Sequence, residues 1–281
     1  MSNFLGDGPL VSVIISTLNA EKHLDECLNS IFSQRDPSWE LIIIDGGSTD
    51  QTLEIIRRNE ARIAFWMSEG DRGIYDAWNK ALPHIRGTWV VFLGADDSWA
   101  SDDVLACVRP CLEAAGNAQR KIVYGKVAAV NEAGRHIELF GMPWTRLERR
   151  FYWEMCIPHQ AVFHHFSLFA GGRCFDPQFR YAGDYEFLLR TIFQDEPEFC
   201  DMVVARWRNG GVSTRAELSS SVYAEFRLAR QLNKLDGTKI TGAERWARFK
   251  AALSRLVGQR LMNVVVDGFR LLTGRVPRAW S

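Results

Sequence analysis

The sequence lacks several features that would place it in a familiar class. Lys plus Arg and Asp plus Glu both total 34 in 281 residues, so there is no chain-wide basic field for nucleic acid. No apolar run approaches the roughly 18 residues that a spanning helix needs, and the first eight residues do not read as a signal peptide. These absences predict a cytoplasmic protein that does not bind nucleic acid.

Paired cysteines and glycine-rich phosphate loops are absent as well. The six cysteines include no CxxC pair, so we expect all of them to be reduced. Neither GxGxxG after a strand nor GxxxxGK[ST] occurs, which argues against a dinucleotide dehydrogenase and a P-loop NTPase. A nucleotide would have to be held by carboxylates and a metal instead.

Apolar strands and amphipathic helices alternate through the first hundred residues. Short β-branched or aliphatic runs occur at Val11–Ile15, Trp39–Ile44 and Thr88–Leu93, and helical spacing occurs between them. Continuous apolar strands between helices predict a Rossmann-like, mostly parallel sheet flanked by helices. Because the last third is helical, we expect an α/β fold with a helical C-terminal appendage.

Polar clusters follow three of these strands, at Ser16–Ala20, Asp45–Asp50 and Gly94–Asp97. Ligands of an open parallel sheet bind beyond the carboxyl ends of its strands, so three clusters in order favour a ligand site. Locally, Asp50 is also explained as a helix cap, and the glycines of the second cluster as a turn.

Asp96 and Asp97 are the most specific local feature. Adjacent carboxylates repel each other unless a cation lies there, and Mg²⁺ or Mn²⁺ is commonly shared between carboxylates and substrate phosphates. The alternative is a solvated turn that leads into a helix. The pair predicts a divalent-metal site.

Four segments together resemble the family 2 inverting glycosyltransferases, which have the GT-A fold. They read SVIISTLN (12–19), ELIIIDGGSTD (40–50), EGDRGIYDAWN (69–79) and GADD (94–97). The resemblance is strong over about residues 10–100 and thinner to about 215. It is closest to bacterial enzymes of exopolysaccharide and lipopolysaccharide assembly.

The resemblance implies both an architecture and an activity. Residues 1–220 would form the GT-A domain, with a nucleotide-binding half of about 1–100 and an acceptor half of about 101–220, and 221–281 would be a helical basic segment. The enzyme would move a sugar from a nucleotide diphosphate, by default a UDP-sugar, to a saccharide or lipid-linked acceptor in cell-surface polysaccharide synthesis. The reaction would be a metal-assisted single displacement.

Site roles also follow from the resemblance. Nucleotide-sugar contacts are implied for Thr17, Asn19, Asp45, Arg72 and Asp96. Asp45 would accept from a ring N–H of the base, and Asp97, with Asp96, would bind Mn²⁺ or Mg²⁺. Asp76 and Asn79 would orient the loop that carries Arg72.

The acceptor half holds the expected catalytic base. Tyr181–Arg190 resembles the family segment that carries it, and Asp184 matches the acidic residue. Asp184 would take the proton of the acceptor hydroxyl as that oxygen attacks the anomeric carbon. The alternative is that Asp184 only caps a helix, and Glu186 is the next candidate base.

Two residues keep open interpretations. His159 contacts the donor phosphates, the metal or the acceptor, or it is only structural. Arg215 ends a Gly-rich stretch that begins at Asn209, which either closes over the diphosphate or is a surface loop.

Two other classes compete with a transferase. A non-catalytic relative would bind a nucleotide sugar and scaffold polysaccharide assembly, but it would need no base, which argues against it. A nucleotidyltransferase shares the sheet and the metal, but normally has a Gly-rich loop with Arg and Lys after the first strand, which Ser16–Ala20 lacks.

The C-terminal segment is basic and amphipathic. From Phe226 to Ser281 there are 12 Lys or Arg against 3 Asp or Glu. Between Ala243 and Leu261, large apolar residues recur at helical spacing: Trp246, Phe249, Leu253 and Leu256. Either this stripe binds an anionic membrane surface, which would make the enzyme peripheral on the inner face of the cell membrane, or it packs on the catalytic domain.

Overall fold

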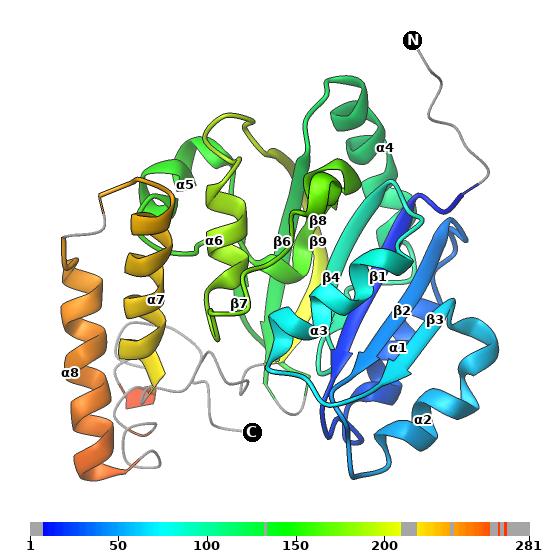
Figure 1. Cartoon of the computed structure of the whole chain (residues 1–281), viewed down its shortest axis with the longest axis horizontal. Coiled ribbons are helices and arrows are strands. Elements are labelled where there is room, and N and C mark those ends of the chain that lie inside the picture. The colour runs from blue at the N-terminus through cyan, green and yellow to red at the C-terminus, as the bar shows by residue number, and fades with distance from the viewer. Residues whose placement is uncertain are drawn as a thin grey trace.

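The computed structural model describes residues 8–131, 134–208, 218–236 and 239–258, together with positions 264, 267 and 268. Nine strands of this part form one sheet in the order β3-β2-β1-β4-β8-β6-β9-β5, with β7 paired to β6 (Figure 1). The strands are β1 (Val11–Thr17), β2 (Trp39–Asp45), β3 (Phe65–Ser68), β4 (Trp89–Gly94), β5 (Ser98–Trp99), β6 (Ile122–Val130), β7 (His136–Phe140), β8 (Val162–His165) and β9 (Glu198–Arg208).

Helices alternate with these strands and then continue the chain beyond β9. They are α1 (Leu24–Phe32), α2 (Thr52–Arg58), α3 (Ile74–Ala81), α4 (Val104–Asn117), α5 (Trp144–Phe151), α6 (Gly183–Leu189), α7 (Ser219–Leu232) and α8 (Gly242–Val257). Short 3-10 turns are η1 (Glu60–Arg62), η2 (Leu82–His84), η3 (His159–Ala161) and η4 (Phe166–Gly172). None of the helices in the described ranges is long and apolar enough to cross a bilayer.

The half of the sheet nearest the N-terminus is parallel. β1 pairs in parallel with β2 and β4, and β2 pairs in parallel with β3. Beyond β4 the sheet is mixed, because β8 runs antiparallel to both β4 and β6, whereas β6 and β9 are parallel. The predicted α/β class, with a sheet flanked by helices and a helical C-terminal region, is confirmed.

Alternation along each strand divides the core between the two faces of the sheet. Ile14, Ile42 and Phe92 pack with α3, α5, α6 and α7 on one face, whereas their sequence neighbours Ile43 and Val91 pack with α1, α2 and α4 on the other (Figure 1). Because successive side chains of a strand point to opposite faces, a strand buried on both faces must be apolar at nearly every position. This explains the unbroken runs in the sequence.

The first C-terminal helix belongs to this core. Phe226 of α7 makes an edge-on ring contact with Tyr185 of α6, with centroids 5.0 Å apart. Glu225 accepts hydrogen bonds from the backbone N–H groups of Tyr181 and Ala182, at 2.8 and 2.9 Å. α7 therefore packs directly against α6, the helix that carries Asp184. The predicted domain boundary at residue 220 stays a prediction.

Candidate active site

Three polar side chains lie side by side where the parallel strands end. The strand register pairs Thr17 of β1 with Asp45 of β2, and Asp45 with Ser68 of β3. Because these strands are parallel, their carboxyl ends share one edge of the sheet, which is where open α/β sheets bind ligands. The first two polar clusters of the sequence therefore meet as predicted.

Asp45 is the centre of this row. Its carboxylate is fully buried and accepts from the hydroxyls of Thr17 (2.8 Å), Ser48 (2.5 Å) and Ser68 (2.7 Å) and from the N–H groups of Gly47 (3.0 Å) and Ser48 (2.9 Å). Burial acts to raise the pKa of Asp45, but these hydrogen bonds outweigh it and hold the pKa below its ordinary value. An incoming base would have to replace one of these donors, and the base contact of Asp45 stays a prediction.

Asn19, in the loop after β1, forms hydrogen bonds with the loop after β2. Its backbone N–H donates to Ser48 Oγ at 2.8 Å, and its side-chain Oδ1 accepts from Thr49 N at 2.9 Å. Asn19 has a φ of 50°, a left-handed conformation that Asn tolerates better than most residues. The residue thus shapes the loop between Asp45 and α2.

Arg72 lies on the exposed loop after β3. Its side chain is 75% exposed and pairs with Asp76 at 3.0 Å, while its backbone N–H donates to the same carboxylate. The predicted orienting role of Asp76 is confirmed. That of Asn79 is wrong, because its amide pairs instead with the backbone of Phe175, donating to O at 2.8 Å and accepting from N at 2.9 Å.

Asp96 and Asp97 differ in environment. Asp96 is exposed, whereas Asp97 is only 4% exposed and accepts from Arg208 N at 3.2 Å and from the Gln160 side chain. Burial, and then the charge of Asp96, raise the pKa of Asp97 to about 8. The solvated-turn alternative is therefore wrong for Asp97, which is a buried carboxylate that a cation would stabilise.

The two carboxylates converge over Gly94. A Cβ atom at position 94 would lie 2.7 Å from Asp97 Oδ2 and 2.9 Å from Asp96 Oδ1, so only glycine leaves that space open. Hard divalent cations take oxygen ligands, and Mg²⁺ keeps several positions for water and substrate phosphates. Within the described ranges no group of three or more His, Cys, Asp or Glu side chains is arranged so that it could hold a metal ion by itself. The donor set thus fits Mn²⁺ or Mg²⁺ only as a cation shared with a diphosphate.

Asp184 occupies the first turn of α6 and is held from the other half of the molecule. Tyr75 of α3 donates its hydroxyl to Asp184 Oδ1 at 3.2 Å. Burial, and then the Asp184 charge, raise the pKa of Tyr75 well above its usual value, so the phenol stays protonated and remains a donor. A Cβ at Gly183 would lie 2.8 Å from the Tyr75 ring. Sequence reasoning missed Tyr75 and Gly183, although both lie in the segments that carry the resemblance.

Glu186, the second candidate base, has a structural role. It is 5% exposed, forms an ion pair with Arg190 and accepts from Asn233 Nδ2 at 3.2 Å. The Glu186 carboxylate is therefore engaged by Arg190 and Asn233. Asp184 is the better candidate for the base.

His159 is buried behind the acidic residues. Its Nε2 lies 3.2 Å from Nε2 of His164, and its ring stacks on Trp78 with centroids 5.1 Å apart. Burial lowers the pKa of His159, and Asp184 opposes that shift. Its neighbour Gln160 is a side-chain hydrogen-bond partner of Asp97. The structure gives His159 a packing role, and its contact with phosphates or acceptor stays a prediction.

Arg208 is a further cation at this edge. Its guanidinium pairs with Glu26 at 2.6 Å and the residue is 7% exposed, while its backbone N–H reaches Asp97. Sequence reasoning gave it no role, because it ends an ordinary strand. Arg215, expected either to lie in a loop that closes over the diphosphate or in a surface loop, lies outside the described residues.

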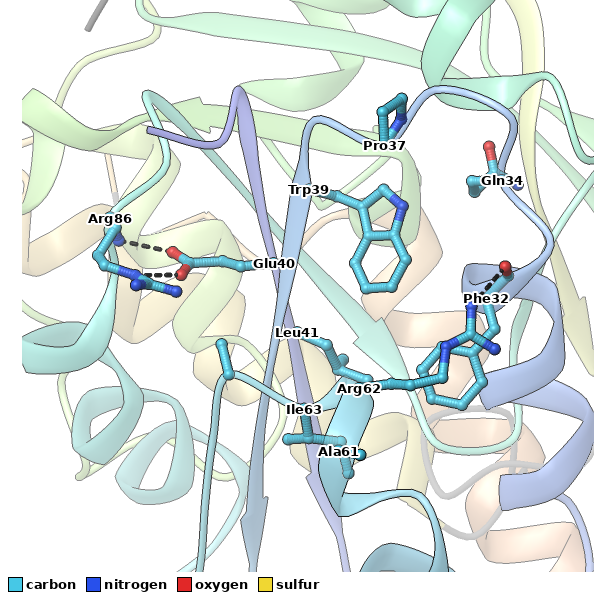
Figure 2. Close-up of a pocket in the computed structure, with 11 residues that line it drawn as sticks. Phe32, Gln34, Pro37, Trp39, Glu40, Leu41, Ala61, Arg62, Ile63 and Arg86 are labelled. Atoms are coloured by element: carbon cyan, nitrogen blue, oxygen red, sulfur yellow. Dashed lines mark hydrogen bonds and ion pairs between the residues drawn. The ribbon is translucent and has the colours of Figure 1, made fainter. Parts of the chain in front are cut away.

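A pocket of about 470 Å³ lies elsewhere, at the amino ends of β2 and β3 (Figure 2). Trp39 faces Arg62 across it, Arg62 stacks over the ring of Phe32 at 4.0 Å, and Glu40 turns away to pair with Arg86. Parallel strands present ligand sites at their carboxyl ends. This hollow is therefore distinct from the candidate active site.

The fold, with its polar strand ends at one edge of the sheet, is that of a glycosyltransferase of the GT-A type. A model of glycosyl transferase family 2 matches residues 12–171. The chain is 33% identical over 211 residues to a PGL/p-HBAD biosynthesis glycosyltransferase of Mycobacterium bovis, which covers 73% of this chain and 79% of that one. The chain belongs to glycosyl transferase family 2, and it is a glycosyltransferase.

Solved structures show the same fold. Staphylococcus aureus TarS 1-349 in complex with UDP-GlcNAc superposes with a TM-score of 0.61 and 20% identity over 86% of this chain and 70% of that one. The mannosyltransferase PcManGT of Pyrobaculum calidifontis, in complex with GDP-Man and Mn²⁺, gives a TM-score of 0.61 and 18% identity over 96% of this chain and 82% of that one.

Proposed function

We propose that this enzyme is an inverting glycosyltransferase of cell-surface polysaccharide synthesis. It transfers a sugar from a nucleotide diphosphate, by default UDP, to a saccharide or lipid-linked acceptor. The observation that carries the proposal is the position of Asp184, which Tyr75 of α3 holds by a hydrogen bond at 3.2 Å. A transferase needs a base beside its donor site, and Tyr75 follows the loop that carries Arg72.

The reaction is a single displacement. The acceptor oxygen attacks the anomeric carbon as the bond from that carbon to the diphosphate oxygen breaks, and the leaving diphosphate takes the electron pair. Asp184 accepts the proton of the acceptor hydroxyl. Asp96 and Asp97 would hold Mn²⁺ or Mg²⁺, which when bound supplies positive charge to the leaving diphosphate. Attack opposite the leaving group inverts the anomeric centre.

The donor site lies along the row Thr17, Asp45 and Ser68, with Asn19 and Arg72 on its loops. Support comes from the solved structures with the same fold, because one is in complex with UDP-GlcNAc and the other with GDP-Man and Mn²⁺. The assignment to cell-surface glycans is supported by the M. bovis relative, a PGL/p-HBAD biosynthesis glycosyltransferase. We further propose that a lipid-linked acceptor brings the enzyme to the inner face of the cell membrane.

A nucleotide-sugar panel tests the proposal. With Mn²⁺ and an acceptor extract, one donor should release its nucleoside diphosphate, and NMR of the product should show the anomeric configuration inverted relative to the donor. Asp184→Asn should lower turnover about 10²-fold with donor affinity unchanged. Asp201→Asn is the matched control, since it makes the same change at an exposed carboxylate paired with Lys126.

Two results would refute parts of the proposal. Retention of configuration would exclude a single displacement. Normal turnover of Asp184→Asn would show that another group is the base.

A further inference from the structure

The last described helix, α8, turns its large apolar side chains to solvent. Trp246 is 58% exposed, Phe249 56% and Leu256 84%. The rings of Trp246 and Phe249 stack with centroids 5.4 Å apart. Large apolar groups that recur at helical spacing and remain exposed form a continuous patch, which is unusual for a surface that meets only water. We call these three residues the α8 stripe.

The opposite face of α8 packs on α7 through small and polar residues. Ala247, Ala251 and Ser254 are each at most 3% exposed, and Ser219 of α7 donates to the carbonyl of Ala247 at 3.0 Å. A helix that covers a soluble core normally turns its apolar face inward. Here the small residues face inward, so the sequence alternative in which the stripe packs on the catalytic domain is wrong for Trp246, Phe249 and Leu256, whereas Leu253 is half-buried.

The acidic side chains of this part of the chain are buried or paired with a cation. Of the three acidic residues after Phe226, Glu244 and Asp267 are each 1% exposed, and Asp236 pairs with Lys239 at 3.4 Å. Glu244 lies between Arg227 and Arg248, at 2.6 and 2.8 Å. The face that remains exposed carries cations beside the stripe, such as Arg245.

We infer that the α8 stripe and Arg245 dock on an anionic bilayer surface. The combination of exposed aromatic rings, an aliphatic group and flanking arginine suits a helix that lies in the membrane interface, with rings at headgroup depth. Charge complementarity selects an anionic bilayer over a neutral one. The biological purpose of this contact, which is access to a lipid-linked acceptor, rests on the proposed function, whereas the contact itself does not.

Vesicle sedimentation of the full-length protein tests the inference. Vesicles of equal parts phosphatidylglycerol and phosphatidylcholine should pellet the protein, and pure phosphatidylcholine vesicles should pellet much less. The triple variant Trp246→Ala, Phe249→Ala, Leu256→Ala should lower the partition coefficient at least about tenfold, because it removes the groups that enter the bilayer. Arg245→Gln should lower it about fivefold on anionic vesicles only. Each variant changes exposed side chains, so circular dichroism should match the wild type.

The matched control replaces two exposed apolar side chains away from α8, Leu139→Ala and Phe166→Ala, and should bind as the wild type does. Sedimentation velocity without lipid shows whether a second copy of the protein covers the α8 stripe. A wild-type dimer that the triple variant converts to a monomer would show that a second copy covers the stripe. A monomer that does not bind anionic vesicles would show that the α8 stripe does not dock on a bilayer, and either result overturns the inference. Donor turnover is scored separately, so vesicle binding without any transferase activity would reject the proposed function alone.

Discussion

The hydroxyl of Tyr75 donates to Asp184 across the two halves of the molecule. The oxygens lie 3.2 Å apart although the residues are separated by 109 positions in the chain. Tyr75 follows the loop that carries Arg72, so a residue beside the donor loop fixes the carboxylate that would deprotonate the acceptor. The contact links the proposed donor side of the site to the proposed acceptor side.

Tyr75→Phe should lower turnover about tenfold while leaving donor affinity unchanged. The ring keeps its stacking on Phe175, with centroids 5.8 Å apart, so the change removes the hydroxyl and its hydrogen bond to the carboxylate without removing the ring contact. Hydrogen bonds to charged groups are worth roughly 1.5–3 kcal/mol. Steady-state kinetics at varied acceptor, with calorimetry for the donor, separates kcat from binding.

The control for this variant is Tyr124→Phe, which removes a hydroxyl that donates only to the carbonyl of Met142, at 2.7 Å. Its kinetics should match the wild type. Unchanged kcat in Tyr75→Phe would show that the contact has no part in positioning Asp184.

The parallel half of the sheet could be predicted from sequence because its strands are apolar at most positions. The polar clusters after Thr17, Asp45 and Gly94 were also visible, since strand ends fix where such residues meet. The pairing of Tyr75 with Asp184, or of Asn79 with Phe175, could not be predicted, because it depends on how aromatic side chains pack the two halves together. Helical spacing likewise reveals the α8 stripe but not which way it faces.

Asp97→Asn should abolish metal-dependent turnover without unfolding the protein. The change removes a carboxylate ligand and roughly several kcal/mol of transition-state stabilisation that the cation would supply. Because burial raises the pKa of Asp97 to about 8, a neutral amide there avoids a desolvation cost, and the metal-free melting temperature should not fall. Turnover with titrated Mn²⁺ and thermal unfolding in EDTA measure both effects.

Asp96→Asn provides the comparison, because Asp96 is exposed. This variant should lower the affinity for Mn²⁺ more than it lowers turnover at saturating Mn²⁺. Wild-type turnover that persists undiminished in excess EDTA would contradict the metal assignment for both residues.

Asp45→Asn should destabilise the protein and weaken nucleotide binding together. An amide cannot accept all five hydrogen bonds that the buried carboxylate receives, so we expect a loss of roughly 3 kcal/mol in the free energy of unfolding. Urea denaturation measures that loss, and calorimetry with UDP measures the affinity. Asp50→Asn, in the same loop but partly exposed just before α2, should cost much less, because Asn caps a helix about as well as Asp. Equal losses in the two variants would show that Asp45 does not organise the site.

The buried pair His159 and His164 should make the protein less stable in mild acid. Burial, and then the charge of His159, hold the pKa of His164 well below its usual value, so the folded protein keeps that ring neutral. As pH falls below about 6.5, His164 binds a proton in the unfolded chain but stays neutral in the folded protein. The free energy of unfolding therefore decreases until the pH reaches the lower pKa of the folded state.

His164→Phe removes this titration. It places a phenyl ring beside Phe92 and Phe187, whose ring centroids lie 5.7 and 5.8 Å from that of His164. At pH 7.5 the variant should lose about 1 kcal/mol, because His159 loses its partner. Between pH 7 and pH 5 its unfolding free energy should fall less steeply than that of the wild type, whereas His136→Phe, at an exposed position on β7, should follow the wild-type slope. Urea unfolding across this range measures the slopes, and identical slopes in His164→Phe and the wild type would show that His164 is not kept neutral by the fold.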